Sequence, residues 1–128
     1  MVENLELTKR QMEKREQFKA FVDSEIVPAA RHIDAEECVP DSVLQRIIGQ
    51  GFWGAALPAE YGGADMDYVT YGLWNEEIGR GCANLRNIIG VQSMVTSSIL
   101  RWGSKEQKRH WLPRMSSGEL MVAFAITE

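Results

Sequence analysis

Arg86 is the side chain whose setting most suggests chemistry. It is the only charged residue between Arg80 and Arg101, within an otherwise apolar stretch. An unpaired charge is costly to bury, so this guanidinium must either extend to solvent or meet a carboxylate. The carboxylate could come from another element of the chain or from a ligand, and the residues alone leave these alternatives open.

The other candidate groups give weaker indications of catalysis. Glu76 and Glu77 are adjacent, and neighbouring helical side chains point about 100 degrees apart, so they are not an acid and a base on one face. A solvated helix face is the simpler expectation for both. Ser93, Ser97 and Ser98 have no histidine and carboxylate nearby in the sequence, as a nucleophile would need. We nominate no catalytic residue in this chain.

Composition argues against several classes of protein. A net charge of -4 provides no basic field for nucleic acid. Cys38 and Cys82 form no CxxC pair, and His32 and His110 are isolated, so we expect no metal site. No apolar stretch approaches about 20 residues, so we expect no membrane span. The charged amino-terminal segment resembles neither a secretory signal nor an organelle leader, which predicts a cytoplasmic protein.

A basic stretch with two interleaved tryptophans occupies residues 101–114, RWGSKEQKRHWLPR. The simplest interpretation is a solvated face above two core tryptophans, Trp102 and Trp111. A docking surface for an acidic partner is the alternative.

These side chains are carried by about five expected helices in one domain-sized chain of 128 residues. Pro28 should kink or divide the first helix near Val27. Gly72 and Gly79 lower helix propensity, which close packing or a ligand would explain. The expected helices cover residues 7–33, a short segment from Asp41 or Ser42 with Gln45 as capping-box partner and Gly51 as stop, a segment from Met66, a central buried helix over 84–103, and a last helix opened by a Ser104–Gln107 capping box.

The segment LMVAFAIT, residues 120–127, is the only convincing strand, and no other segment of the chain offers it a partner. A lone strand cannot satisfy its backbone groups. The segment therefore ends a helix, pairs with another copy of the chain, or begins a domain that this chain lacks.

Three motifs in register resemble the amino-terminal half-domain of the acyl-CoA dehydrogenase family of flavoproteins. They are LPAEYGG (57–63), RWGSKEQKRHWLPRMSSGE (101–119) and AFAITE (123–128). The resemblance implies a mainly α fold, with a helical bundle over residues 1–118 and, at 119–128, the first strand of an otherwise absent FAD-binding β-domain. It implies an oxidoreductase that dehydrogenates a short acyl-CoA, with a carboxylate base supplied by a carboxy-terminal domain and hydride passed to the flavin.

The resemblance also implies cofactor contacts at the end of the chain. In this family an aromatic-x-apolar-Thr-Glu strand runs past the flavin, and it is matched by Phe124, Ala125, Ile126, Thr127 and Glu128. Thr127 would hydrogen-bond the isoalloxazine edge. We expect these 128 residues alone to be inactive and to retain no FAD. We expect the complete protein to be a homo-oligomer, with an electron acceptor that the sequence does not identify.

Two finer resemblances concern the substrate. In glutaryl-type dehydrogenases an arginine fifteen positions after YGL receives a distal carboxylate, and Arg86 stands fifteen positions after Tyr71, with Asn87 beside it. Gly79 departs from that pattern, which has an acidic residue there. The segment RGCANLRNIIGVQSMV is similar to dehydrogenases of polyketide extender-unit pathways, which act on an acyl group carried by an acyl carrier protein (ACP). A non-catalytic helical interaction module is the alternative to an enzyme.

Overall fold

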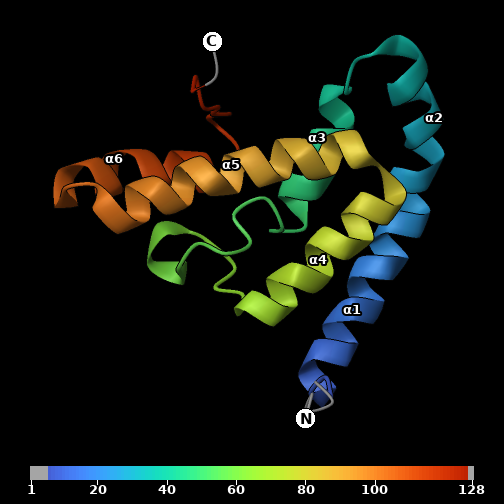
Figure 1. The fold of residues 1–128 in the computed structure, drawn as a ribbon, viewed down its shortest axis with the longest axis horizontal. Coiled ribbons are helices and arrows are strands. Elements are labelled where there is room, and N and C mark those ends of the chain that lie inside the picture. The colour runs from blue at the N-terminus through green and yellow to red at the C-terminus, as the bar shows by residue number, and fades with distance from the viewer. Residues whose placement is uncertain (1–5, 127–128) are drawn as a thin grey trace.

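The computed structural model describes residues 6–126 and shows a helical fold over that range (Figure 1). No strand occurs among these residues, and none of the helices in this range is long and apolar enough to cross a bilayer. The expectation of a mainly α fold is confirmed. The elements are α1 (Lys9–Phe21), the π-helical segment η1 (Val22–Ile26), α2 (Val27–Glu36), α3 (Asp41–Gly49), the 3-10 turn η2 (Ala59–Tyr61), α4 (Tyr68–Gly81), α5 (Ala83–Trp102) and α6 (Lys105–Ser116).

The first helix is divided by a π-helical turn just before Pro28, close to where the sequence predicts a break. Pro28 has no N–H to donate to the carbonyl of Ser24, and its ring crowds that carbonyl. The chain widens by one residue, so that the amide of Val27 donates to the carbonyl of Val22, five residues back. The widened turn buries Val22 and Ile26.

An aromatic core lies between α1, η1, α4 and the loop after α3. Phe18, Phe21, Phe52 and Trp74 are buried there, with ring centroids between 4.8 and 6.2 Å apart. The glycine-rich loop between α3 and α4 is held by backbone hydrogen bonds that join residues 54–57 to residues 64–66. The four rings of this core are therefore covered by one another and by the surrounding elements.

Of three predicted helix ends, two are confirmed and one is wrong. Ser104 and Gln107 form the expected capping box at the start of α6. Gly51 follows α3 in the left-handed region, with φ +74°. The Ser42–Gln45 box does not form, because α3 begins at Asp41 after an N-cap at Pro40 that has no side-chain hydrogen bond. Ser42 is therefore already inside the first turn.

Helices α5 and α6 lie side by side across the molecule (Figure 1). The prediction that α5 is a central buried helix is wrong, because only one of its faces is covered. Leu85, Ile89, Gln92 and Thr96 are buried, whereas Met94 on the other face is 55% exposed. The apolar composition of this helix thus belongs partly to an open surface.

After α6 and the turn at residues 117–118, residues 119–126 form a segment that is neither helix nor strand. A strand is defined by ladder hydrogen bonds, and no second extended segment of the described range lies beside this one to form a ladder. That residues 119–128 form the first strand of a β-domain therefore stays a prediction. Thr127 and Glu128 lie outside the described residues.

Candidate functional site

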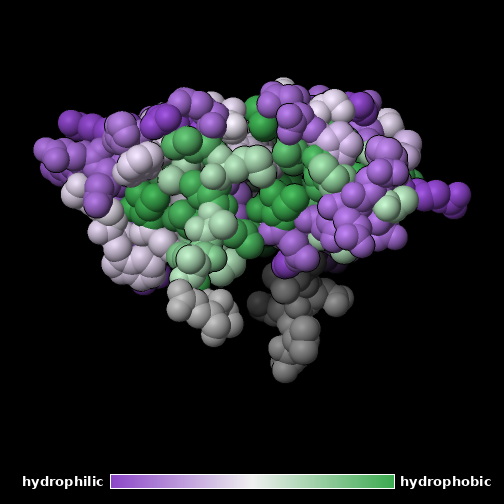
Figure 2. All heavy atoms as spheres, turned by 90° about the horizontal axis from the view of Figure 1, so that it is seen from above, coloured by the Kyte–Doolittle hydropathy of each residue, from purple (hydrophilic) through white to green (hydrophobic). Residues whose placement is uncertain are grey.

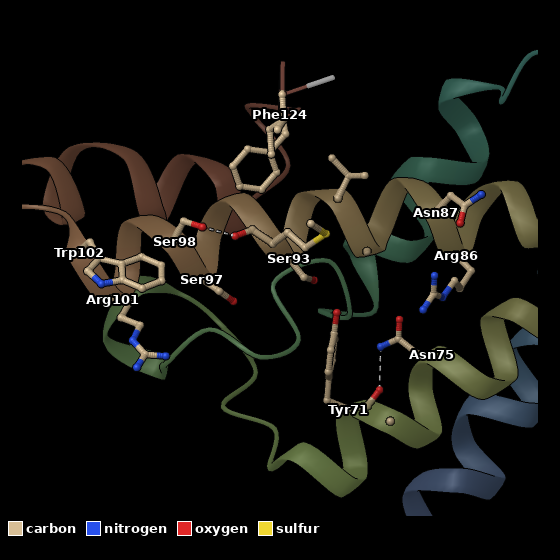
Figure 3. A pocket seen from close by; sticks show the side chains of 15 residues that line it. Tyr71, Asn75, Arg86, Asn87, Ser93, Ser97, Ser98, Arg101, Trp102 and Phe124 are labelled. Carbon is tan, nitrogen blue, oxygen red and sulfur yellow. Dashed lines mark hydrogen bonds between the residues drawn. The ribbon is translucent and has the colours of Figure 1, made fainter. Parts of the chain in front are cut away.

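An open groove of about 940 Å³ runs along the exposed face of α5, and we call it the α5 groove (Figure 3). One wall comes from α4, the floor from α5, and Phe124 and Ile126 of the carboxy-terminal segment complete it. Seen from above, hydrophobic residues gather in a band across the middle of the molecule, flanked by hydrophilic ones (Figure 2). The groove joins three segments that are far apart in the sequence.

Arg86 lies in the α5 groove with its side chain exposed to solvent. Figure 3 shows its guanidinium directed into the space between α5 and α4, on the side of Asn75. None of the ion pairs among residues 6–126 includes Arg86, so the alternative of a carboxylate from another described element is wrong. Its stem packs over Gly79, where an added Cβ would lie 3.5 Å from the Arg86 Cγ. The cation is therefore available to a ligand.

Asn87 also lines the α5 groove, but its amide points to the other side of α5 from Arg86 (Figure 3). The same residue borders a second hollow between α5 and the α2–α3 turn. The structure thus places both predicted substrate-binding residues at one end of the groove, with different orientations.

Two helical glycines of the groove have open space in front of them. An added Cβ at Gly72 of α4 or at Gly90 of α5 would meet no heavy atom within 4 Å. A glycine inside a helix costs about 1 kcal/mol relative to alanine, and packing within the described chain accounts for neither one. Gly90 was not singled out from the sequence, because its value lies in the free volume that only the fold reveals.

The predicted cofactor contacts that the structure describes are exposed along the groove, and Figure 3 shows Phe124 above the middle of α5. Phe124 and Ile126 are 40% and 71% exposed, and both line the groove, whereas Ala125 does not. No amide from Ala123 to Ile126 donates a hydrogen bond to another described residue. Apolar side chains beside free backbone donors suit a planar aromatic ring that carries acceptor atoms at its edge. The described residues therefore fit a flavin ring.

Glu76 and Glu77 have different surroundings. Glu76 is exposed and has Arg15 at 3.8 Å. Glu77 is buried, so the expectation of a solvated face is wrong for it. Its carboxylate accepts from the Arg80 Nε at 2.8 Å, and Arg80 also bonds Asp23 of η1 at 2.7 Å. The hydrogen bonds to Asp23 and Glu77 raise the pKa of Arg80. The network ties α4 to η1 and leaves neither glutamate near the groove.

The basic stretch carries exposed tryptophans, so the prediction of two core tryptophans there is wrong. Trp102 is 73% exposed and Trp111 is 39% exposed. Arg101 stacks on the Trp102 ring at 5.1 Å, and Arg114 lies 5.8 Å from the Trp111 ring. The space between α5, α6 and the loop is already filled by a small cluster of Leu57, Leu112 and Met115.

Among residues 6–126 no three metal-binding side chains cluster together. The α5 groove instead offers two arginines without an ion pair among these residues, Arg86 and the tryptophan-stacked Arg101, with small residues along two helices and the apolar side chains of Phe124 and Ile126. Such a site suits an elongated, mainly apolar ligand with one anionic group.

Comparison with known proteins agrees with this geometry. Residues 8–119 match the family model described as acyl-CoA dehydrogenase, N-terminal domain. The chain is 38% identical over 109 residues to the mitochondrial short-chain specific acyl-CoA dehydrogenase of Homo sapiens, covering 84% of this chain and 26% of that protein.

Solved structures give the same result. A glutaryl-CoA dehydrogenase from Mycobacterium smegmatis in complex with FADH2 superposes with a TM-score of 0.83 at 29% identity, covering 90% of this chain and 30% of that one. A glutaryl-coenzyme A dehydrogenase–glutaryl-CoA complex gives 0.82 at 30% identity, with 91% and 31% covered. The chain thus spans about a third or less of the length of these relatives.

Proposed function

The chain belongs to the acyl-CoA dehydrogenase family, as its amino-terminal domain, and from this we propose that it is the leading part of an FAD-dependent acyl thioester dehydrogenase. The flavin, when bound, supplies the hydride acceptor for α,β-dehydrogenation. The part of this chain is to shape the α5 groove, with Phe124 and Ile126 beside the flavin. We propose Thr127 and Glu128, which lie outside the described residues, together with Ala125, as further contacts of that segment.

The observation that carries this proposal is the exposed Arg86 cation, which forms no ion pair among residues 6–126, in a groove that Phe124 and Ile126 also line. We propose that Arg86 receives a distal carboxylate of a short acyl group, with Asn87 as a second polar contact. A charge-assisted hydrogen bond of this kind contributes about 1.5 to 3 kcal/mol. The glutaryl-CoA complex among the structural neighbours supports an acyl group with a second carboxylate. The open space at Gly72 and Gly90 supports an occupant that approaches both helix backbones.

The test compares acyl-CoA substrates with and without a distal carboxylate, using the complete protein and its Arg86→Ala variant. We expect kcat/KM for the carboxylate-bearing substrate to fall by about 10- to 100-fold, the equivalent of the lost charge-assisted bond. The substrate without a carboxylate should change by less than about threefold. Arg101→Ala, which removes another arginine of the same groove, is the matched control.

Two results would contradict the proposal in different places. An equal loss for both substrates would show that Arg86 does not read the carboxylate. A complete protein that purifies without flavin would contradict the flavoprotein assignment and favour the non-catalytic interaction module.

A second candidate is an acyl group carried by an ACP. It is favoured by the exposed basic and aromatic side chains of α6, among them Arg109 and Trp111, next to the Arg101–Trp102 end of the groove. ACP surfaces are acidic, so charge reversal at Lys108 and Arg109 should raise KM for a carrier-linked substrate and leave the CoA-linked one unchanged. Unchanged turnover of the carrier-linked substrate would remove the docking argument.

We further propose residues 1–118 as the helical domain and 119–128 as the first strand of the FAD-binding β-domain of the complete protein. The helices that precede residue 119 and the absence of helix from residues 119–126 support this boundary. A cytoplasmic location and a homo-oligomeric complete protein are likewise proposals, which fractionation and light scattering would test.

A further inference from the structure

Gln92 is a buried polar side chain that joins the middle of α5 to the carboxy-terminal segment. It is 2% exposed. Its Nε2 donates to the carbonyls of Met115 and Leu120, each at 3.1 Å, and its Oε1 accepts from the amide of Val122 at 3.0 Å. These three bonds use both donors of the side-chain amide, and the reverse orientation would aim its oxygen at two carbonyls. The amide therefore has one satisfied orientation.

The pattern of these bonds resembles one unit of a β-ladder. The side-chain amide of Gln92 donates to the carbonyl of Leu120 and accepts from the N–H of Val122, the two residues that flank Met121. A residue of a neighbouring parallel strand makes the same pair of hydrogen bonds. Gln92 thus supplies, from a helix, the hydrogen-bonding partner that the sequence lacks for its apparent strand. The carbonyl of Leu120 and the amide of Val122 are thus satisfied without a sheet.

The three hydrogen bonds of Gln92, which we call the Gln92 clasp, also determine which side chains face the groove. Leu120, Val122, Phe124 and Ile126 alternate along the segment, as side chains on one side of an extended chain do. Leu120 and Val122 pack against the small cluster between α5 and α6, and Phe124 and Ile126 line the α5 groove. A slip of one residue would turn all four away from α5. The three bonds of Gln92 hold the register that avoids this slip.

We propose that Gln92 is a positioning residue that sets Phe124 and Ile126 at the groove, and through them the flavin ring. This inference rests on the proposed function for its flavin part and goes beyond it in assigning a role to a residue that the groove does not expose. Gln92 does not line the α5 groove, so it acts through the segment that it holds.

The experiment uses the complete flavin-loaded protein and three variants. Gln92→Met fills a similar volume without hydrogen bonds, and Gln92→Glu replaces the donating nitrogen by oxygen. Thr96→Val is the control, because Thr96 is buried one turn further along α5 and bonds only the carbonyl of Ser93 within its own helix. Far-UV circular dichroism establishes that each variant is folded.

Hydrogen exchange at the Val122 amide is the readout that does not depend on the flavin. We expect at least about a tenfold faster exchange in Gln92→Met and no change in Thr96→Val, because only the first removes the acceptor of this amide. In the same variant we expect a shifted flavin absorption spectrum and a lower kcat with KM within about twofold, as for a misplaced reacting partner.

Gln92→Glu adds a pH readout that a packing role would not show. The ionised carboxylate would face two carbonyls, whereas the protonated acid can donate to one carbonyl and still accept from Val122. Protection of Val122 and the flavin spectrum, each relative to the wild type, should recover as pH falls in Gln92→Glu and stay altered in Gln92→Met. Recovery in both variants or in neither would overturn the role of the donor.

The outcomes separate the two proposals. A wild-type protein without flavin overturns the proposed function and the flavin part with it. A flavin-loaded wild type whose Gln92→Met variant keeps Val122 protected overturns the clasp. Lost protection with an unchanged flavin spectrum overturns the positioning role and leaves Gln92 a purely structural residue.

Discussion

The α1–η1–α4 core and the α5 groove contain similar residue types but use them in opposite ways. In the core, Phe18 and Trp74 are fully buried and pack against other rings. Along the groove, Met94 and Trp102 are more than half exposed, although α5 carries fewer charges than α1. The comparison shows that an apolar helix is not necessarily a buried one. Its free face can be the part of the surface that receives a ligand or another domain.

Two glycines of α4 show the same contrast between a packed core and an open groove. Gly81 allows α4 to approach η1 so closely that an added Cβ would lie 2.5 Å from the Val22 Cγ1. Gly72, on the same helix, faces open space in the groove. One glycine serves packing inside the chain, and the other leaves room for something outside it.

The largest difference between the two regions should appear between their tryptophans. Trp74→Ala should lower the free energy of unfolding by about 3 to 5 kcal/mol, because it removes a ring that contacts three others. Trp102→Ala should change it by less than about 0.5 kcal/mol, because that ring is exposed. Urea unfolding monitored by circular dichroism measures both. A cost at Trp102 close to that at Trp74 would mean that the groove face is not open.

Alanine substitutions at Gly81 and Gly72 should change the free energy of unfolding by smaller amounts and in opposite directions. Gly81→Ala should destabilise by about 1 to 3 kcal/mol through overpacking against Val22 and Ile26. Gly72→Ala should stabilise by up to about 1 kcal/mol through helix propensity. In the complete protein the same Gly72→Ala change should raise KM for the acyl substrate, because its methyl group enters the groove. Stabilisation without any effect on KM would argue that no ligand reaches α4.

The smallest effect concerns pH at the start of α4, the helix that both regions share. Asp67 caps this helix, and its bonds from the Thr70 hydroxyl and the Thr70 amide keep the pKa of its carboxyl below the usual 3.8. A lowered pKa in the folded state adds stability above the unfolded value, and this part is lost as pH falls through the folded value. The urea midpoint should therefore decrease less between about pH 5 and pH 3 in Asp67→Asn, which keeps the capping oxygen but does not titrate.

The sequence predicted those features that depend only on residues close together along the chain. The Ser104–Gln107 capping box, the break near Pro28 and the stop at Gly51 each depend on residues within one turn, and the structure confirms all three. The exposure of the Arg86 side chain is also one of the alternatives that its isolation among apolar residues indicates. The family resemblance, which the comparisons confirm, came from three motifs rather than from any single residue.

Predictions failed where the surroundings of a side chain are supplied by distant segments. Glu77 was expected in solvent but is buried, because Arg80 and, beyond it, Asp23 of η1 compensate its charge. Trp102 was expected in the core but is exposed, because Leu112 and Met115 of α6 already fill the space beside α5. Hydrophobicity alone does not say which of two apolar faces is covered.

The sequence by itself determined the helices, most of their ends, the family and the residues that match its motifs, since these depend on neighbours along the chain. Only the tertiary structure decided that α5 has an open face, that Arg86 has no partner among residues 6–126, and that Gln92 holds the extended segment. The reason is that burial, free volume and long-range hydrogen bonds are properties of segments that pack together. The donor and acceptor of Gln92 meet backbone groups 23 to 30 residues away, and no local pattern encodes that contact.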